Sequence, residues 1–126
     1  MKSAPRAFGL VTLLLAASAI GSAHAASPFD GTYSGTYVNT TPGGGGCSEG
    51  GTTSRQVVDG VFTSRWLTSE LRATVSADGT IDGGGNVGGG GRGGGLVSIR
   101  GKIAGNVMSY DASSQRCQFH FEGRRR

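Results

Sequence analysis

The fold is decided by the stretch Gly95–Glu122, which reads GLVSIRGKIAGNVMSYDASSQRCQFHFE. Gly105-Asn106 near its middle is typical of the two-residue loop that joins the antiparallel strands of a β-hairpin. That loop would set Ile103 opposite Met108. Alternate side chains would then fall on opposite faces of both strands, as the pleat of a β-strand requires. The stretch therefore predicts a hairpin of defined register, with one apolar and one polar face.

A second turn is expected at Ser113-Ser114. It would set Tyr110 opposite Cys117 and, on the other face, Asp111 opposite Arg116. A slip of one residue would exchange the two faces, so the segregation of side chains supports this alignment. The result is a three-stranded antiparallel meander. Its apolar face comprises Ile99, Ile103, Met108, Tyr110, Cys117, Phe119 and Phe121, and its polar face comprises Arg100, Lys102, Ser109, Asp111, Arg116, Gln118 and His120.

Residues 1–25 have the layout of a cleaved secretory signal peptide, in which the apolar part forms a helix. Lys2 and Arg6 flank the start of an apolar run over residues 7–20. Small residues stand where a signal peptidase reads them, so cleavage is expected between Ala25 and Ala26. The apolar run is shorter than the roughly 20 residues of a spanning helix, and no later segment is apolar enough to span a membrane. We therefore expect a protein of the periplasm or a secreted protein.

The two cysteines, Cys47 and Cys117, both lie in the part of the chain that would be exported. In an oxidising compartment such a pair favours a disulfide, which would also help a domain whose core is small. The alternatives are free thiols or a metal or nucleophile role. His120, the one histidine in residues 26–126, would lie on the opposite face of its strand from Cys117. We therefore expect a disulfide and no metal site.

Residues 26–126 are expected to form a single small all-β domain, because the apolar residues alternate and no segment has helical periodicity. Two glycine-rich segments, residues 40–52 and 83–95, interrupt the alternation and are expected to be flexible loops. The second is glycine throughout apart from Asn86, Val87 and Arg92, and it lacks the ending that a phosphate-binding loop requires. Eight strands are predicted, at about residues 31–39, 53–59, 61–67, 70–77, 80–86, 95–104, 107–112 and 115–122.

Asp59-Gly60 is a further hairpin signal, with alternating residues on either side. It would set Val57 opposite Phe62. We expect Val57, Phe62 and Trp66 to face inward, an assignment that also turns Arg55 inward.

The strand order predicts a chain that runs up and down. The tight turns at Asp59-Gly60, Asp78-Gly79 and Gly105-Asn106 would then share one end of the domain, and the longer connections would share the other. Cys47 and Cys117 both fall at this second end, which we call the long-loop end. A bond between them requires the first strand to lie near the eighth, which a small closed barrel allows. An open β-sandwich is the alternative.

Several motifs of the domain occur together in another group of proteins. They are Phe29–Gly35 (FDGTYSG), Val75–Gly79 (VSADG), Gly101–Asn106 and a late Cys117 followed by aromatic residues. In these motifs the chain resembles uncharacterised small exported bacterial proteins that share an opening Phe-Asp-Gly-Thr-Trp-Ser motif, a Val-Ser-x-Asp-Gly turn, a Gly-Asn turn and one cysteine pair. Tyr33 stands where that group has tryptophan. The resemblance implies a fold, and it supplies no catalytic residue.

No catalytic site is expected. Most carboxylates of the domain occur in predicted turns, where Asp stabilises the backbone locally. Asp111 would lie between Arg100 and Arg116 in a surface ion-pair ladder worth about 0–1 kcal/mol per pair. Glu49 and Glu70 near the long-loop end are isolated acids. Because no acid, base and nucleophile are expected to converge, we predict that the protein is not an enzyme and uses no cofactor.

Charge narrows the choice of partners. The net charge of +4 falls to about +2 when Lys2 and Arg6 are removed, and nucleic acid is not expected as a partner of an exported protein. The cationic end Arg124–Arg126 is expected to be a solvated terminus, with adhesion to an anionic envelope surface as the alternative. We expect a monomer.

Two classes of function remain. The first is a binding module that holds a small apolar ligand or a protein partner at the long-loop end, with Tyr37, Trp66 and Arg92 as the candidate contact residues. A soluble inhibitor of a foreign enzyme would be a special case of this class. The second is a structural or envelope-associated protein with no specific ligand.

Overall fold

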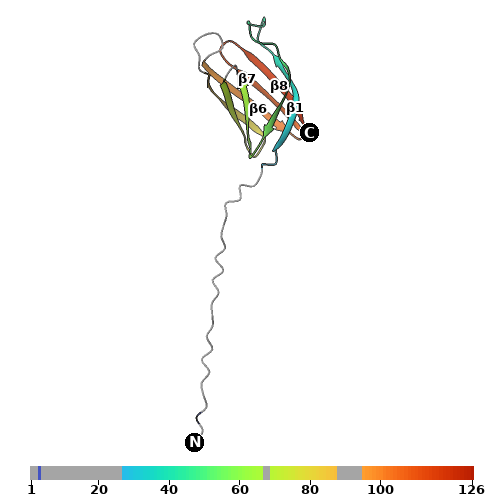
Figure 1. Ribbon diagram of the computed structural model, residues 1–126, viewed down its shortest axis with the longest axis vertical. Helices are drawn as coiled ribbons and strands as arrows, with labels where there is room; N and C mark the ends of the chain where they lie inside the picture. Colours follow the sequence, from blue (N-terminus) through green and yellow to red (C-terminus); the bar gives the residue numbers. More distant parts are fainter. Residues whose placement is uncertain (1–2, 4–26, 67–68, 88–94) are drawn as a thin grey trace.

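The computed structural model describes residue 3 and residues 27–66, 69–87 and 95–126, so the predicted signal peptide, its cleavage site and Arg92 lie outside the described residues. The described chain forms an eight-stranded antiparallel meander that curls into a nearly closed barrel (Figure 1). The all-β prediction is confirmed. The strands are β1 (Gly31–Asn39), β2 (Gly51–Val57), β3 (Val61–Trp66), β4 (Ser69–Val75), β5 (Thr80–Val87), β6 (Gly95–Ala104), β7 (Val107–Ser113) and β8 (Gln118–Arg125).

The order of strands in the sheet is β2-β1-β8-β7-β6-β5-β4-β3. As a barrel requires, β1 lies beside β8, with Tyr37 opposite Phe121. The two edges of the sheet are β2 and β3, which are consecutive in the chain. Within the described residues, a single bridge between Val58 and Val61 is the only pairing that joins them.

The prediction that Val57 pairs with Phe62 in a β-hairpin is therefore wrong, because the pairing of the two strands stops at the bridge between Val58 and Val61. The backbone of β2 pairs instead with β1, from Gly31–Val57 to Tyr37–Gly51. We call the unpaired edges, residues 51–57 of β2 and 61–66 of β3, the seam. The barrel is thus open inside a segment that was expected to be a hairpin.

The turn at the closed end of the seam has the geometry that its sequence predicts. Asp59 and Gly60 have φ of 51° and 73°, and positive φ at both loop positions is the mark of a type I′ turn. Asp30, just before β1, accepts hydrogen bonds from the backbone N–H groups of Asp59 (2.8 Å) and Gly60 (3.0 Å). The carboxylate therefore attaches the start of β1 to the turn between the two edge strands.

The register of β6 with β7 is as predicted, with Ile103 opposite Met108 around the Gly105-Asn106 loop. The register of β7 with β8 was predicted incorrectly. Ser113 pairs with Gln118, so the loop has four residues, and the Ser114 side-chain oxygen accepts from the N–H groups of Arg116 and Cys117. The shift is an even number of residues, so the inward and outward faces are unchanged.

Two consequences follow for pairs across these strands. Tyr110 lies opposite Phe121 rather than Cys117, and Asp111 lies opposite His120 rather than Arg116. Arg100 lies opposite Asp111 as predicted, but the ladder of Asp111 between two arginines does not form, because His120 takes the place expected for Arg116. The ion pair of Arg100 is with Asp82, at 3.8 Å.

The predicted strand 80–86 and the predicted loop 83–95 overlap at Gly83, Gly84 and Gly85. These glycines belong to β5 and pair with β6, so the strand is confirmed and the start of the loop at residue 83 was predicted incorrectly. Their lack of side chains has a packing reason. A Cβ on Gly83 would overlap the backbone of Ala73, and a Cβ on Gly84 would overlap the carbonyl of Val97. Glycine at these positions allows neighbouring strands to approach closely as the sheet curves. The first predicted loop is likewise shorter than expected, since β2 begins at Gly51.

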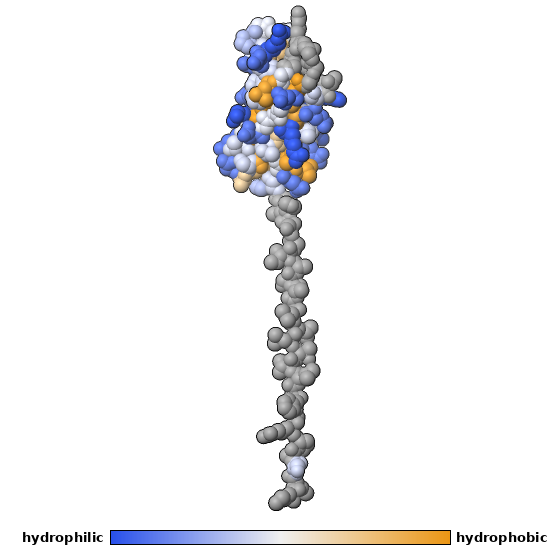
Figure 2. All heavy atoms as spheres, turned by 90° about the vertical axis from the view of Figure 1, so that its left-hand side faces the viewer, coloured by the Kyte–Doolittle hydropathy of each residue, from blue (hydrophilic) through white to orange (hydrophobic). Residues whose placement is uncertain are grey.

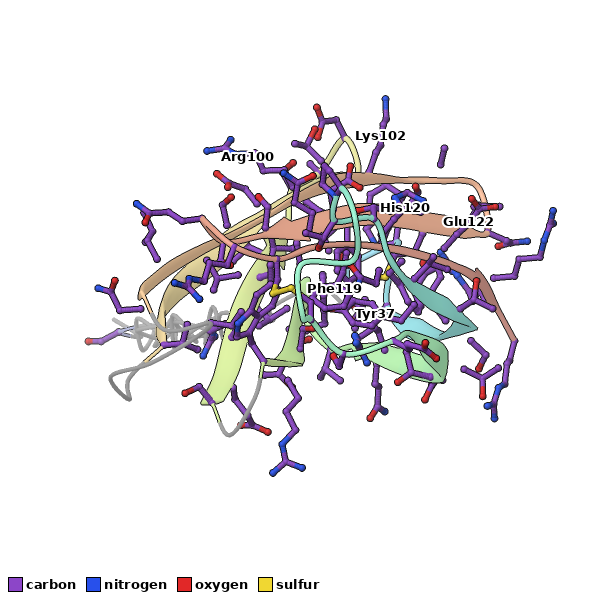
Figure 3. All side chains as sticks on the ribbon, turned by 90° about the horizontal axis from the view of Figure 1, so that it is seen from above. Tyr37, Arg100, Lys102, Phe119, His120 and Glu122 are labelled. Atoms are coloured by element: carbon purple, nitrogen blue, oxygen red, sulfur yellow. A yellow bond between two sulfur atoms is a disulfide. The ribbon has the colours of Figure 1, made fainter. Side chains whose placement is uncertain are left out.

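The interior of the barrel holds the core. The predicted inward residues of the last three strands are buried, with the exception of the half-buried Cys117, and Val57, Phe62 and Trp66 join them. Viewed down the barrel, Tyr37 and Phe119 lie inside the ring of strands, whereas Arg100 and Lys102 point outward (Figure 3). On the outer face shown in Figure 2, apolar residues form separate patches among hydrophilic ones. The space inside the wall is therefore where the apolar surface is concentrated.

Candidate functional site

The disulfide between Cys47 and Cys117 forms as predicted, with the two Cα atoms 5.9 Å apart. It joins the loop after β1 to the turn before β8, at the long-loop end. Backbone and side-chain hydrogen bonds support the same connection: Thr40 N–H donates to the Gln118 carbonyl at 2.8 Å, and Gln118 N–H donates to Thr41 Oγ1 at 2.8 Å. The start of the first long loop is therefore fixed to the barrel wall.

Glycines 43–46 allow this loop to reach Cys117. All four have positive φ, between 58° and 78°, a conformation that other residues rarely adopt in succession. The chain bends sharply there, with Gly44 N–H donating to the Thr41 carbonyl and Cys47 N–H donating to the Gly44 carbonyl. The glycine content of this segment thus serves a tight backbone path rather than flexibility alone.

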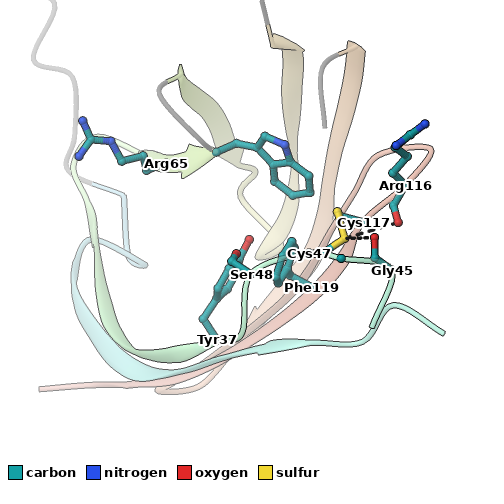
Figure 4. A pocket seen from close by; sticks show the side chains of 10 residues that line it. Tyr37, Gly45, Cys47, Ser48, Arg65, Arg116, Cys117 and Phe119 are labelled. Carbon is teal, nitrogen blue, oxygen red and sulfur yellow. Dashed lines mark hydrogen bonds between the residues drawn. A yellow bond between two sulfur atoms is a disulfide. The ribbon is translucent and has the colours of Figure 1, made fainter. Parts of the chain in front are cut away.

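The bridged loop covers one side of a cavity of about 150 Å³ at the long-loop end (Figure 4). Three aromatic side chains line it. The Tyr37 and Phe119 rings are stacked with centroids 4.8 Å apart, and Trp66 meets Phe119 edge-on at 5.3 Å. The remaining lining comes from Gly45, Gly46, Cys47, Ser48, Arg65, Arg116 and Cys117.

The lining of the cavity is mixed: three aromatic rings and the disulfide supply apolar surface, and Ser48 and two arginines supply polar atoms. The guanidinium groups of Arg65 and Arg116 point away from it (Figure 4). Burial, and to a smaller extent the neighbouring Tyr110, raises the pKa of Tyr37 to about 12, although Arg55 opposes the increase. The phenol is therefore neutral at physiological pH and remains a hydrogen-bonding group. The cavity therefore suits a small, mainly apolar ligand with few polar atoms.

Arg55 lies next to Tyr37 and points into the barrel, as predicted from the inward-facing positions of its strand. Its Nε donates to the hydroxyl of Tyr110 at 2.8 Å, and its Nη1 donates to Thr53 Oγ1 at 2.9 Å and to the Ser54 carbonyl at 3.0 Å. The guanidinium also lies over the rings of Tyr37 and Phe121, with centroid distances of 5.8 Å and 5.4 Å. Such cation–π contacts favour a cation in this otherwise apolar interior.

The structure brings two of the three predicted contact residues together, because Tyr37 and Trp66 both line the cavity. Arg92, the third, lies outside the described residues. Phe119 is the central ring of the cavity and was expected only as a core residue. Its position at the cavity depends on the register of β8, which was predicted incorrectly because the loop before β8 was expected to be shorter.

A second group of chemically relevant side chains lies on the outer wall, contrary to the expectation that no acid, base and nucleophile converge. His120 Nδ1 is 2.9 Å from Asp111 Oδ1, and its Nε2 is 3.3 Å from Ser109 Oγ. This is the order of contacts found in a Ser-His-Asp triad. However, β7 pairs with a strand on each side, so the backbone N–H groups around Ser109 are committed to the sheet. These backbone N–H groups therefore cannot form an oxyanion hole, and none of the three residues lines the cavity.

Comparisons with protein-family models, with curated proteins and with solved structures give no match. In the part of the chain that the structure describes, no group of three or more metal-binding side chains is found. The same part contains no helix long and apolar enough to cross a membrane.

Proposed function

We propose that this protein is a small exported binding module that holds a ring-sized apolar group in the cavity at the long-loop end. One observation carries the proposal: Tyr37, Trp66 and Phe119 enclose a cavity of about 150 Å³ beside a disulfide. Since the bridge and the rings are already in place, little ordering entropy is lost on binding.

The size of the cavity limits the occupant. Drug-sized ligands occupy pockets of roughly 300–1,000 Å³, whereas an apolar cavity of about 150 Å³ holds a molecule of the size of benzene. The occupant is therefore a small cyclic compound, or a single aromatic or branched side chain presented by a protein partner.

Export is the second part of the proposal. The disulfide favours an oxidising compartment. Together with the signal-like residues 1–25, it supports a location in the periplasm or outside the cell. The resemblance to small exported bacterial proteins agrees with this location.

Trp66 provides the test, because it is the single tryptophan of the chain and lines the cavity. We expect phenylacetamide, a neutral ring compound, to change Trp66 fluorescence saturably with a Kd in the micromolar to millimolar range. Tyr37→Ala should weaken this binding about tenfold, because it removes the ring stacked on Phe119. Val38→Ala is the matched control, since Val38 is exposed on the opposite face of the same strand.

Native mass spectrometry of protein purified from its own host separates the remaining cases. A retained small molecule or a copurifying protein supports the two forms of the binding module. Loss of the fluorescence response in every titration, with no retained molecule or protein, would favour the structural or envelope-associated alternative.

A further inference from the structure

The barrel interior contains a cation without an acidic partner. In the described parts of the chain, the ion pairs are those of Arg100 with Asp82 and of His120 with Asp111 and Glu122, and all lie on the outer wall. Arg55 forms none of them, although its side chain is directed inward and contacts Tyr110 and Phe121. Arg55 is half-buried, so its guanidinium has given up part of its hydration without gaining a counter-charge, which costs free energy.

The hydrogen bonds of Arg55 leave part of the group unused. A guanidinium has five N–H donors, and here one on Nε and two on Nη1 are directed at Tyr110, Thr53 and Ser54. The two donors of Nη2 have no acceptor among the described residues. Ser64 lies near the same point: its side chain is 3% exposed and is in contact with the Tyr110 hydroxyl at 3.5 Å. Arg55 on β2 and Ser64 on β3 therefore contact the same Tyr110 hydroxyl from the two edges of the seam.

Tyr37 connects this polar group with the cavity. One ring lines the cavity at the long-loop end and lies 5.8 Å from the Arg55 guanidinium carbon. Arg55 itself does not line the cavity, so a ligand with its ring there would need a polar arm that reaches past Tyr37 toward Arg55. The arm most suited to a guanidinium is a carboxylate, because charge-assisted hydrogen bonds are stronger than neutral ones, especially away from bulk water.

We propose that Arg55 is the anion-recognition residue of this barrel and that its ligands are small ring-containing monocarboxylates. The ring occupies the cavity, and the carboxylate binds Arg55 Nη2. This inference rests on the proposed function of the cavity and adds the chemical class of its ligand.

The test compares two probes of nearly equal shape, phenylacetate and phenylacetamide, by Trp66 fluorescence at neutral pH. Phenylacetate should bind the wild-type protein at least about tenfold more tightly, since a hydrogen bond to a charged group contributes more than one to a neutral group. Arg55→Gln should reduce the affinity for phenylacetate to that for phenylacetamide and leave the latter unchanged. Arg55→Lys keeps the positive charge but loses the planar, bidentate guanidinium, so it should retain part of the preference for phenylacetate over phenylacetamide.

Arg72→Gln is the control for net charge, because Arg72 is exposed on the outer wall of β4 and should not alter either affinity. Denaturation curves of each variant check that the barrel is intact. Equal binding of the two probes to wild type would overturn the assignment of Arg55 while the cavity remains a binding site. Equal weakening of both probes by Arg55→Gln would show a purely structural role. Failure of both probes to bind wild type would overturn the proposed ligand class. If native mass spectrometry also finds no retained molecule or protein, the proposed function is overturned as well.

Discussion

The carboxylate of Asp30 accepts a hydrogen bond from the backbone N–H of Gly60 at 3.0 Å, and its other oxygen accepts from the N–H of the preceding residue. These two bonds join the first strand of the barrel to the turn between the two edge strands. The sheet itself supplies a single bridge there, between Val58 and Val61. The Asp of the opening Phe-Asp-Gly motif thus has a mechanical role in closing the barrel.

Asp30→Ala should therefore destabilise the protein by about 1–3 kcal/mol, because two backbone donors lose a charged acceptor. Asp30→Asn keeps one acceptor oxygen and should cost less. Urea denaturation measures both, and amide exchange at Asp59 and Gly60 should accelerate in the Ala variant. Unchanged exchange at these two amides would show that the turn does not depend on Asp30.

Neighbouring substitutions in β7 should differ greatly in effect, because Tyr110 is 1% exposed and Asp111 faces solvent. Tyr110→Asp should cost more than about 3 kcal/mol, from the lost ring and the buried carboxylate. Asp111→Lys removes the exposed contact with His120 and should cost less than about 1 kcal/mol. A milder effect for Tyr110→Asp in denaturation experiments would mean that the faces of the strand are assigned in reverse.

The disulfide closes a large loop, since its cysteines are separated by 70 positions. In the chain-entropy model, replacing both Cys47 and Cys117 by Ala should lower the free energy of unfolding by about 4 kcal/mol. A thiol assay on unreduced wild-type protein should detect no free thiol. Two reactive thiols in folded, exported protein would contradict the bridge, and so would equal stability of the wild type and the double variant.

The turn at Asp78 should make stability depend on acid pH. A hydrogen bond from the Ser76 hydroxyl, followed by bonds from Thr80, lowers the pKa of Asp78 from 3.8 to about 2. Because the folded-state pKa is the lower one, the contribution is complete above about pH 4 and disappears as the pH falls toward 2. The urea midpoint of Asp78→Ala should therefore be below that of wild type at neutral pH and approach it through this window. A difference that stays constant down to pH 2 would show that the carboxylate charge is not involved.

Ser109 should not act as a nucleophile, despite its contact with His120. A fluorophosphonate probe should label wild type no more than it labels Ser109→Ala, because the neighbouring backbone N–H groups are engaged in the sheet. Stoichiometric labelling that depends on both Ser109 and His120 would establish a reactive triad on the outer wall and overturn the proposal that the protein is not an enzyme.

The fold could be predicted from local signals to the extent that short turns determine register. Gly105-Asn106 allowed the alignment of β6 with β7 to be predicted residue by residue, because a two-residue loop leaves no alternative. Ser113-Ser114 gave the wrong register for β7 and β8. The loop has four residues and is stabilised by the Ser114 hydroxyl, and its polar composition is similar to that of a two-residue turn. The faces were still assigned correctly, since an even shift preserves the alternation. Gly83–Gly85 fell in both the predicted strand 80–86 and the predicted loop 83–95, because glycine carries no periodic signal that would separate the two, although the close approach of the strands requires glycine there.

The sequence was enough to predict at which end of the barrel the candidate site lies, but not all of the residues that form it. The aromatic residues Tyr37 and Trp66 could be placed at the long-loop end from strand direction alone. The contact of Arg55 with Tyr110, 55 residues away in the chain, depends on barrel closure and has no local sequence signal. The inward direction of Arg55 was visible in the alternation of its strand, where a charged residue stands at an interior position.

The seam also affects how molecules of this protein could contact each other. Its two free edges belong to consecutive strands, so the barrel can open there without any strand leaving the sheet. An opened molecule would present β2 and β3 at once, each with unpaired backbone groups. Pairing of β2 in one copy with β3 in the next would repeat indefinitely, because a head-to-tail contact of this kind does not close on itself. The two hydrogen bonds that Asp30 accepts hold the edges together at one end of the seam, so opening the barrel from that end requires breaking them.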